Sequence, residues 1–287
     1  MFYAQLLVNG IVQGLIIGLS ALAITLVFGI ARFPNAATGD AMTFGAYGAL
    51  FGHKATGSLV LGGAVGILVT ALVSVLAYLT VFKKLADRSV VALLVASIGV
   101  GFVIRAGLGV AFGHGQQVFQ VPLRRPYLVG DIRVNPLDLQ LAGVAVAALA
   151  AVFAILYLTP IGRQMRAVAD NRDLARVSGI RPEPVMLTLW ALAGAVSAVA
   201  GLMIGLKTIV TPEVGWDMLL PAFAAAILGG IGSPVGAIVA GLLIGVAQEV
   251  STPLVGFTYK IALAFAVMLA VLLVRPRGLF GRIEGVR

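Results

Sequence analysis

The sequence predicts an all-α, polytopic transmembrane helix bundle with about eight to nine membrane segments, some of them short or re-entrant half-helices. Composition is the first reason: 60% of the 287 residues are hydrophobic and only 11% are charged, whereas a soluble domain holds about 45–50% and about 25%. The second reason is the length of the uncharged runs, since a helix needs roughly 20 residues to cross a bilayer. These runs lack the period-two alternation of a transmembrane β-barrel.

The apolar spans are 6–31, 59–82, 89–113, 139–162, 185–206, 218–248 and 261–274, and only 89–113 contains a charge, Arg105. Most of them fit one crossing each. The span 218–248 is too long for one helix and is interrupted by the Gly/Pro-rich stretch 229–234, so we expect a tight hairpin or a re-entrant pair there. The segment 40–52 is too short to cross, at roughly 20 Å for a helix.

The basic residues predict how the chain is oriented. Twelve of the 20 Lys and Arg residues fall on one side of the predicted membrane, within 83–88, 159–184 and 275–287. The richer side should be cytoplasmic, which places the C-terminus inside and the Pro-containing loop 114–137 outside, where we expect irregular structure. The N-terminal side stays open, because it depends on whether 40–52 crosses. The net charge of +9 is therefore a membrane-orientation signal and does not indicate nucleic-acid binding.

Motifs for chemistry are missing from the sequence. It has no cysteine, no G-x-x-x-x-G-K-[ST] phosphate loop and no H-E-x-x-H, and its two histidines, His53 and His114, stand alone in predicted loops. We therefore expect a chain with no catalytic residues, no metal site and no cofactor of its own. The first apolar run is too long for a signal peptide and follows no basic residue, so we expect it to remain in the mature protein.

The polar stretch 159–184 is the most informative loop. Asp170, Leu174 and Val177 recur at helical spacing, and Gly179 is a suitable helix stop. We interpret the stretch as a short cytoplasmic helix that docks in a groove of a soluble partner. The alternative is a solvated linker that only satisfies the charge bias of the loops.

A weak internal repeat links two short segments. Asp40 is followed twelve residues later by Gly52, and Asp217 is followed twelve residues later by Gly229. Gly/Pro-interrupted segments at matching places in two halves point to a transport path; the alternative is chance similarity. We expect Asp40 and Asp217 to cap the helices that follow them, and as a functional alternative we place them on the substrate path together with Thr43, Tyr47 and Glu249.

Two further features are explained by structure before any function needs to be assigned to them. Arg105 and Lys260 can reach the membrane surface with their long side chains, so we expect them to act as interfacial anchors. Gly-x-x-x-Gly pairs recur along the chain and allow helices to approach closely. Packing within this chain should account for most of these pairs, although one such face could meet another subunit.

Several stretches resemble branched-chain amino acid importer permeases. Gly162-Arg163-x-Met165-Arg166-Ala167-x-Ala169-Asp170-x5-Arg176-x-x-Gly179-Ile180 is similar to the family's ATPase-docking loop. The stretches 226–237 (AILGGIGSPVGA) and 275–281 (RPRGLFG), and the N-terminal Val27-Phe28-Gly29, Asn35-x3-Gly39-Asp40 and Gly45-Ala46-Tyr47, also fit. The resemblance covers nearly the whole chain and is closest to the first of the family's two paired permeases, the LivH type. The resemblance departs at residues 35–39, where the family usually has Asn-Phe-Ala-His-Gly and this chain has Asn-Ala-Ala-Thr-Gly. The identity of the solute is therefore left open among branched-chain amino acids, urea, amides and aromatic acids.

The resemblance implies a complex. Residues 1–287 would form a single importer transmembrane domain in the bacterial inner membrane, paired with a second permease. A periplasmic binding protein would deliver the solute, and two cytoplasmic ABC ATPases would hydrolyse ATP-Mg. The resemblance places Arg163, Arg166, Asp170, Leu174 and Gly179 in the coupling helix. An ion-coupled secondary transporter and a passive channel remain as alternative functions.

Overall fold

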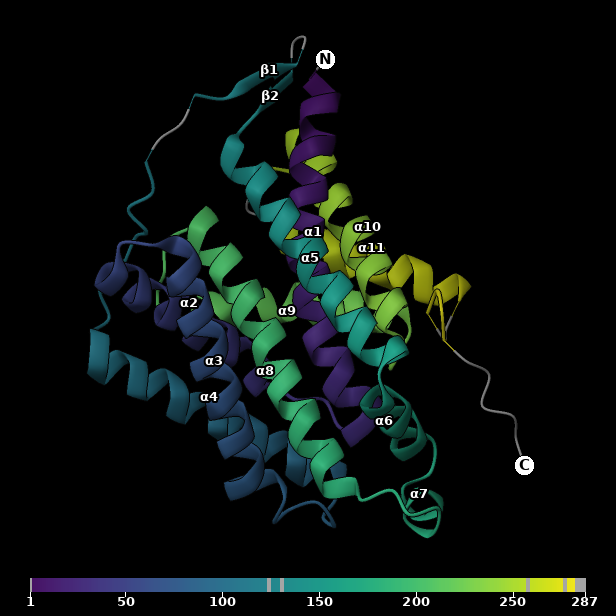
Figure 1. The fold of residues 1–287 in the computed structure, drawn as a ribbon. Helices are drawn as coiled ribbons and strands as arrows, with labels where there is room; N and C mark the ends of the chain where they lie inside the picture. The colour runs from purple at the N-terminus through teal and green to yellow at the C-terminus, as the bar shows by residue number, and fades with distance from the viewer. Residues whose placement is uncertain (1, 123–124, 130–131, 257–258, 276–277, 282–287) are drawn as a thin grey trace.

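The computed structural model describes residues 2–122, 125–129, 132–256, 259–275 and 278–281, and these form a helix bundle (Figure 1). The elements are α1 (Phe2–Ala31), α2 (Ala37–Thr56), α3 (Leu59–Ala77), η1 (Tyr78–Phe82), α4 (Val90–Phe112), β1 (Tyr127–Val129), β2 (Ile132–Val134), α5 (Pro136–Leu158), α6 (Pro160–Asp170), α7 (Arg172–Val177), α8 (Pro182–Lys207), α9 (Val214–Gly229), α10 (Pro234–Val255) and α11 (Lys260–Val274). Among the described residues, six helices are long and apolar enough to cross a membrane, and α9 and α11 are shorter apolar helices. The predicted polytopic helix bundle is confirmed.

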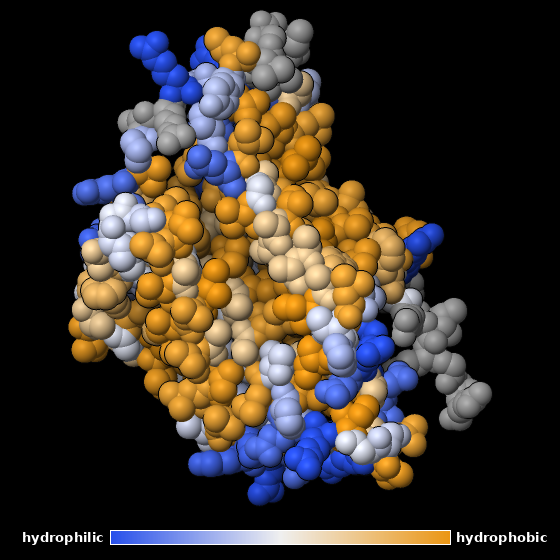
Figure 2. All heavy atoms as spheres, viewed as in Figure 1, coloured by the Kyte–Doolittle hydropathy of each residue, from blue (hydrophilic) through white to orange (hydrophobic). Residues whose placement is uncertain are grey.

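Burial divides the helices into a central and an outer set. α1 and α8 are largely buried, whereas α3, α4 and α5 turn most of their side chains outward. The outward side chains are apolar, as with Leu72 and Val103. Figure 2 shows the result, a broad hydrophobic belt with hydrophilic atoms gathered at its two ends. Such a surface suits the hydrocarbon of a bilayer, because lipid is as apolar as these side chains.

Glycines bring α1 against α10. A Cβ added to Gly14 would lie 2.7 Å from the Cα of Leu242, and one added to Gly10 would lie 2.8 Å from the Cα of Val246. Gly48 of α2 similarly faces Gly66 of α3. The Gly-x-x-x-Gly pairs therefore serve packing within this chain at these contacts, as expected.

The bundle has two polar ends (Figure 2). We call them the β1–β2 end and the α6–α7 end, after the elements that lie there (Figure 1). At the β1–β2 end, the side chain of Gln5 bonds the backbone of Arg133, and Lys207 pairs with Asp138 at 3.3 Å. At the α6–α7 end, Lys83 pairs with Glu183. Lys207 and Lys83 therefore lie at opposite ends of the bundle, as the sequence predicted. The contact of Gln5 with Arg133 places the N-terminus at the β1–β2 end, a point that the sequence left open.

Two expectations about segment length and loop structure were wrong. α2 runs from Ala37 to Thr56, so the short segment 40–52 is part of a 20-residue helix. The polar residues His53 and Lys54 continue the helix beyond the apolar stretch, and Gly57, at φ 70°, ends it. The loop 114–137 is not irregular throughout, because β1 and β2 pair as an antiparallel hairpin in it.

The span 218–248 forms a helical hairpin. α9 and α10 are joined by residues 230–233, where Gly230 and Gly232 have φ of 99° and 82°. The backbone of Leu279 and Phe280 bonds the carbonyls of Leu228 and Gly229 at the end of α9. Gly232 also lies beside Gly29, near the end of α1, so the pair extends toward the α6–α7 end instead of turning back halfway.

Candidate transport path and docking surface

The stretch 159–184 contains two helices where one was predicted. α6 ends at Asp170, and α7 begins at Arg172 after a break at Asn171. The Asn171 side chain accepts hydrogen bonds from the backbone N–H groups of Asp173 and Leu174, both at 3.0 Å. This cap starts a new helix, so Asp170 and Leu174 do not share one helical face as expected.

α6 is firmly attached to the bundle. Its Met165 and Val168 are buried, and Arg32, at the end of α1, donates to the carbonyls of Ala169 and Asp170 at 2.8 and 3.0 Å. Arg166 donates to the carbonyl of Leu156 at the end of α5, and its guanidinium lies 5.3 Å from the Tyr157 ring centroid. Arg163 is exposed on the same helix. α6 is therefore linked to both α1 and α5.

α7 presents apolar side chains to the outside. Leu174 is 64% exposed and Val177 is 86% exposed, although both lie in a polar part of the surface. Beyond α7, Gly179 has φ 83° and takes the chain toward α8, in agreement with its expected role as a helix stop. Leu174 and Val177 are three residues apart, so they are neighbours on the surface of α7.

A cavity of about 870 Å³ lies beside α7. Its lining comes from η1 and the η1–α4 connection on one side and from α7, the α7–α8 connection and the start of α8 on the other. The charged residues in it include Lys83, Asp87, Arg172, Arg176 and Glu183. The hydrogen bond from Lys83 to Glu183 raises the pKa of the lysine. The cavity is therefore charged, and α7 contributes Arg172 and Arg176 to it.

The two short segments related by the sequence repeat meet at the first turns of α2 and α9. A Cβ added to Gly39 would lie 2.8 Å from the carbonyl oxygen of Gly215. The N–H of Gly215 donates to Oγ1 of the buried Thr43 at 3.0 Å. This junction brings together three of the five candidate path residues, Asp40, Thr43 and Asp217.

Asp40 forms an ion pair inside the bundle. Its Oδ1 accepts a hydrogen bond from Nε of Arg105 at 3.0 Å and lies 2.9 Å from Nη2 of the same guanidinium. The side chains of Asp40 and Arg105 are 2% and 18% exposed. Two expectations were wrong here, because Arg105 binds α2 instead of anchoring at the surface, and neither aspartate caps a helix. The N-cap residues are Ala36 and Glu213, and neither makes a side-chain cap.

The other candidates have different surroundings. Asp217 is exposed on α9 beside Trp216, whose ring centroid lies 4.7 Å from the Arg105 guanidinium. Tyr47 is buried one turn beyond Thr43, with its ring 5.1 Å from that of Phe112. Glu249 is apart from this group and pairs with Lys260 at 2.6 Å.

Sequence reasoning missed Arg105 and Trp216 as members of this cluster. A signal was available for the arginine, since Arg105 and Asp40 are opposite charges inside otherwise apolar segments, and such charges pair when they are buried.

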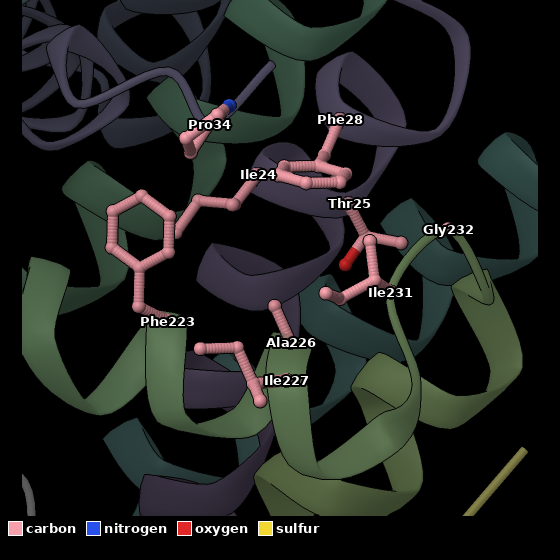
Figure 3. A pocket seen from close by; sticks show the side chains of 9 residues that line it. All are labelled: Ile24, Thr25, Phe28, Pro34, Phe223, Ala226, Ile227, Ile231 and Gly232. Carbon is pink, nitrogen blue, oxygen red and sulfur yellow. The ribbon is translucent and has the colours of Figure 1, made fainter. Parts of the chain in front are cut away.

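One face of α9 leads from Asp217 to a second, smaller cavity. Leu220, Phe223 and Ile227 lie on the same face of α9 as Asp217. Leu220 is exposed, and the other two are half-buried. The cavity of about 200 Å³ is apolar and lies between α1, Pro34 and the α9–α10 turn (Figure 3). Within it, Oγ1 of the buried Thr25 has no hydrogen-bond partner among the described residues.

Comparisons with known proteins agree with this architecture. A family model described as branched-chain amino acid transport system / permease component matches residues 6–272. The chain is 27% identical to the high-affinity branched-chain amino acid transport system permease protein LivH of Salmonella typhimurium, over 99% of this chain and 97% of the relative. It is 28% identical to the corresponding protein BraD of Pseudomonas aeruginosa, over 98% and 97%.

A solved structure shares the fold. PsaBC from Streptococcus pneumoniae, in complex with Fab, superposes with a TM-score of 0.50 at 16% identity, and the match covers 96% of this chain and 93% of that one. Because the family model spans nearly the whole bundle, including α2, α6–α7 and α9, the chain belongs to the family of branched-chain amino acid transport system permease components.

Proposed function

We propose that the chain is the membrane-spanning subunit of an ATP-driven importer of branched-chain or related hydrophobic amino acids in the bacterial inner membrane. The observation that carries the proposal is the family match over residues 6–272. The relatives LivH and BraD, both named as branched-chain amino acid permeases, align over nearly their whole length. The chain acts as a permease, and ATP-Mg is used by its partners.

Two cytoplasmic ABC ATPases would dock at the α6–α7 end. The exposed Leu174 and Val177 supply an apolar contact, and the charged cavity beside α7 supplies a groove for partner side chains. α6 is bonded to the ends of α1 and α5 through Arg32 and Arg166. A movement of the docked ATPase would therefore pass into those two helices.

The remaining partners follow from the orientation. The α6–α7 end is richer in Lys and Arg within the loops, which favours a cytoplasmic position for it and for the C-terminus; residues 282–287 lie outside the described part of the chain. A periplasmic binding protein would then deliver solute at the β1–β2 end, and a second permease would complete the path. We assign the path to the α2–α9 junction with Asp40, Thr43, Tyr47 and Asp217, and leave out Glu249, which Lys260 holds.

Substituting Leu174→Asp tests the docking surface. The change puts a charge into the apolar contact, and burying an unpaired charge is costly. We expect the tagged variant, purified from native membranes in mild detergent, to lose at least nine-tenths of the ATPase that co-purifies with the wild type.

Leu128→Asp is the matched control, because Leu128 is also a well-exposed leucine, 69% against 64%, but lies on β1 at the opposite end. This variant should keep its ATPases. Equal recovery of ATPase with Leu174→Asp and with the wild type would contradict docking at α7.

A further inference from the structure

We propose that Arg105 and Asp217 together hold the two charged groups of a zwitterionic amino acid as it passes through the membrane domain. Arg105 would bind the α-carboxylate and Asp217 would bind the α-ammonium. The inference rests on the proposed function and names the part of the path that selects for an amino acid.

The position of the cluster along α4 is the first argument. Arg105 lies roughly 22 Å along α4 from its first residue and roughly 10 Å from its last, by the rise per residue, within an otherwise uncharged helix. A charge inside such an apolar helix is costly in lipid and is found where the helix faces water, a partner charge or a solute. Asp217 is exposed, and its carboxylate makes no hydrogen bond or ion pair within the described residues.

The hydrogen-bonding capacity of Arg105 is the second argument. A guanidinium has five N–H donors; Asp40 accepts a hydrogen bond from Nε and holds Nη2 in the ion pair. No other acceptor for this group occurs in the described part of the chain. Three donors therefore remain for a carboxylate, which matches the forked geometry that arginine uses to bind carboxylates.

The surroundings fix the guanidinium in place. Its carbon lies 4.7 Å from the Trp216 ring centroid and 5.3 Å from that of Phe102. Aromatic faces attract a guanidinium and restrict its motion. Asp40 holds one edge of the group and Trp216 one face, so the remaining edge is pre-oriented for a ligand.

The balance of charge favours a zwitterion over a simple acid. Asp40 already neutralises Arg105, so the negative charge of Asp217 is left in excess. The neighbouring acid Glu213 and the more weakly acting Arg105 both act on Asp217 electrostatically. A carboxylic acid without an amino group would add a second unbalanced negative charge. An amino acid brings an ammonium to Asp217 together with its carboxylate. Leu220 and Phe223, next on the same face of α9, would contact its aliphatic side chain.

Because the chain has no cysteine, single substituted cysteines test directly whether this face is wet. Asp217→Cys and Leu220→Cys, in the assembled complex in proteoliposomes, should react with a membrane-impermeant charged methanethiosulfonate. Leucine with its binding protein should slow the reaction of Leu220→Cys at least threefold. Val103→Cys, 73% exposed on the outer face of α4, is the lipid-facing control and should not react.

Failure of both α9 cysteines to react would overturn the proposal. So would a disulfide or crosslink from Leu220→Cys to a second permease, because that result would make this face a subunit interface. These outcomes do not depend on which solute the protein carries.

Asp217→Asn then tests the role of the charge. We expect ATP-dependent uptake of radiolabelled leucine to fall at least tenfold, the factor for one lost charge-assisted hydrogen bond, with the complex recovered at wild-type yield. Glu213→Gln, a nearby exposed acid at the start of α9, should stay within twofold of wild type. If the wild type takes up leucine and Asp217→Asn takes it up equally well, this inference is contradicted. If the wild type itself takes up no leucine, the proposed function is contradicted.

Discussion

The ion pair between Asp40 and Arg105 joins α2 to α4 inside the bundle. Both side chains are largely buried, at 2% and 18% exposure. Removing one partner of a buried pair leaves the other charge uncompensated, and this loss usually exceeds the net stabilisation of the intact pair. The pair therefore makes α2 and α4 depend on each other.

Asp40→Asn should lower the free energy of unfolding by about 3–5 kcal/mol, because Arg105 would keep its charge without a partner. Thermal unfolding of the purified chain in detergent measures the loss. The double variant Asp40→Asn/Arg105→Gln should recover most of the stability, since it removes both charges. A single variant as stable as the wild type would show that the pair does not stabilise the fold.

At this scale the sequence predicted one path from Asp40, Thr43, Tyr47, Asp217 and Glu249 but not the surroundings of these residues. Asp40, Thr43 and Asp217 do lie at one junction, whereas Glu249 pairs with Lys260 elsewhere. The repeat put the two aspartates at equivalent places, and the structure does bring the starts of α2 and α9 together through Gly39 and Gly215. Arg105 was assigned to the surface because the length of its side chain allows that position. Only the packing of α4 against α2 decides between the two positions, and a single sequence does not give that packing.

Among the elements, the contact of α1 with α10 shows most clearly how glycines determine packing. In lipid, helices associate through close packing instead of hydrophobic exclusion, so a glycine that admits a neighbouring backbone has a large effect. Gly10 and Gly14 face the backbone of α10 in this way, whereas a Cβ at Gly107 of α4 would meet nothing within 4 Å.

Gly14→Ala should destabilise the chain by about 1–3 kcal/mol, the usual cost of overpacking, because its Cβ would lie 2.7 Å from the Cα of Leu242. Gly107→Ala is the matched control and should be neutral or stabilise by up to about 1 kcal/mol, since alanine favours a helix. Melting temperatures of the two variants in the same detergent provide the comparison. A Gly14→Ala variant no less stable than Gly107→Ala would contradict close packing of α1 on α10.

The sequence predicted most elements but not all of their ends. Uncharged runs located the long helices, because hydrophobicity dominates a membrane segment. The ends of α2 and the break between α6 and α7 depend on polar residues. Asn171 is a good helix cap, yet its position inside a helical pattern hid the break, and polar residues at the end of α2 concealed its full length.

For the whole molecule, the distribution of charge and the apolar belt place the protein in a membrane, and the family match identifies it as a permease component. The separation of its two ends was predictable because basic residues collect in the loops. The contacts between distant spans, such as α2 with α9, were not, since many helix arrangements satisfy the same hydropathy. The central claim is that ATP hydrolysis by docked partners drives amino acid import through this bundle.

The most direct test of that claim is leucine uptake by proteoliposomes that contain the complex isolated with this chain, with binding protein outside and ATP-Mg enclosed. We predict uptake that requires enclosed ATP, continues in the presence of an uncoupler and is lost when Leu174→Asp replaces the wild type. Uptake that proceeds without ATP and collapses with the uncoupler would contradict the account and identify the chain as an ion-coupled carrier.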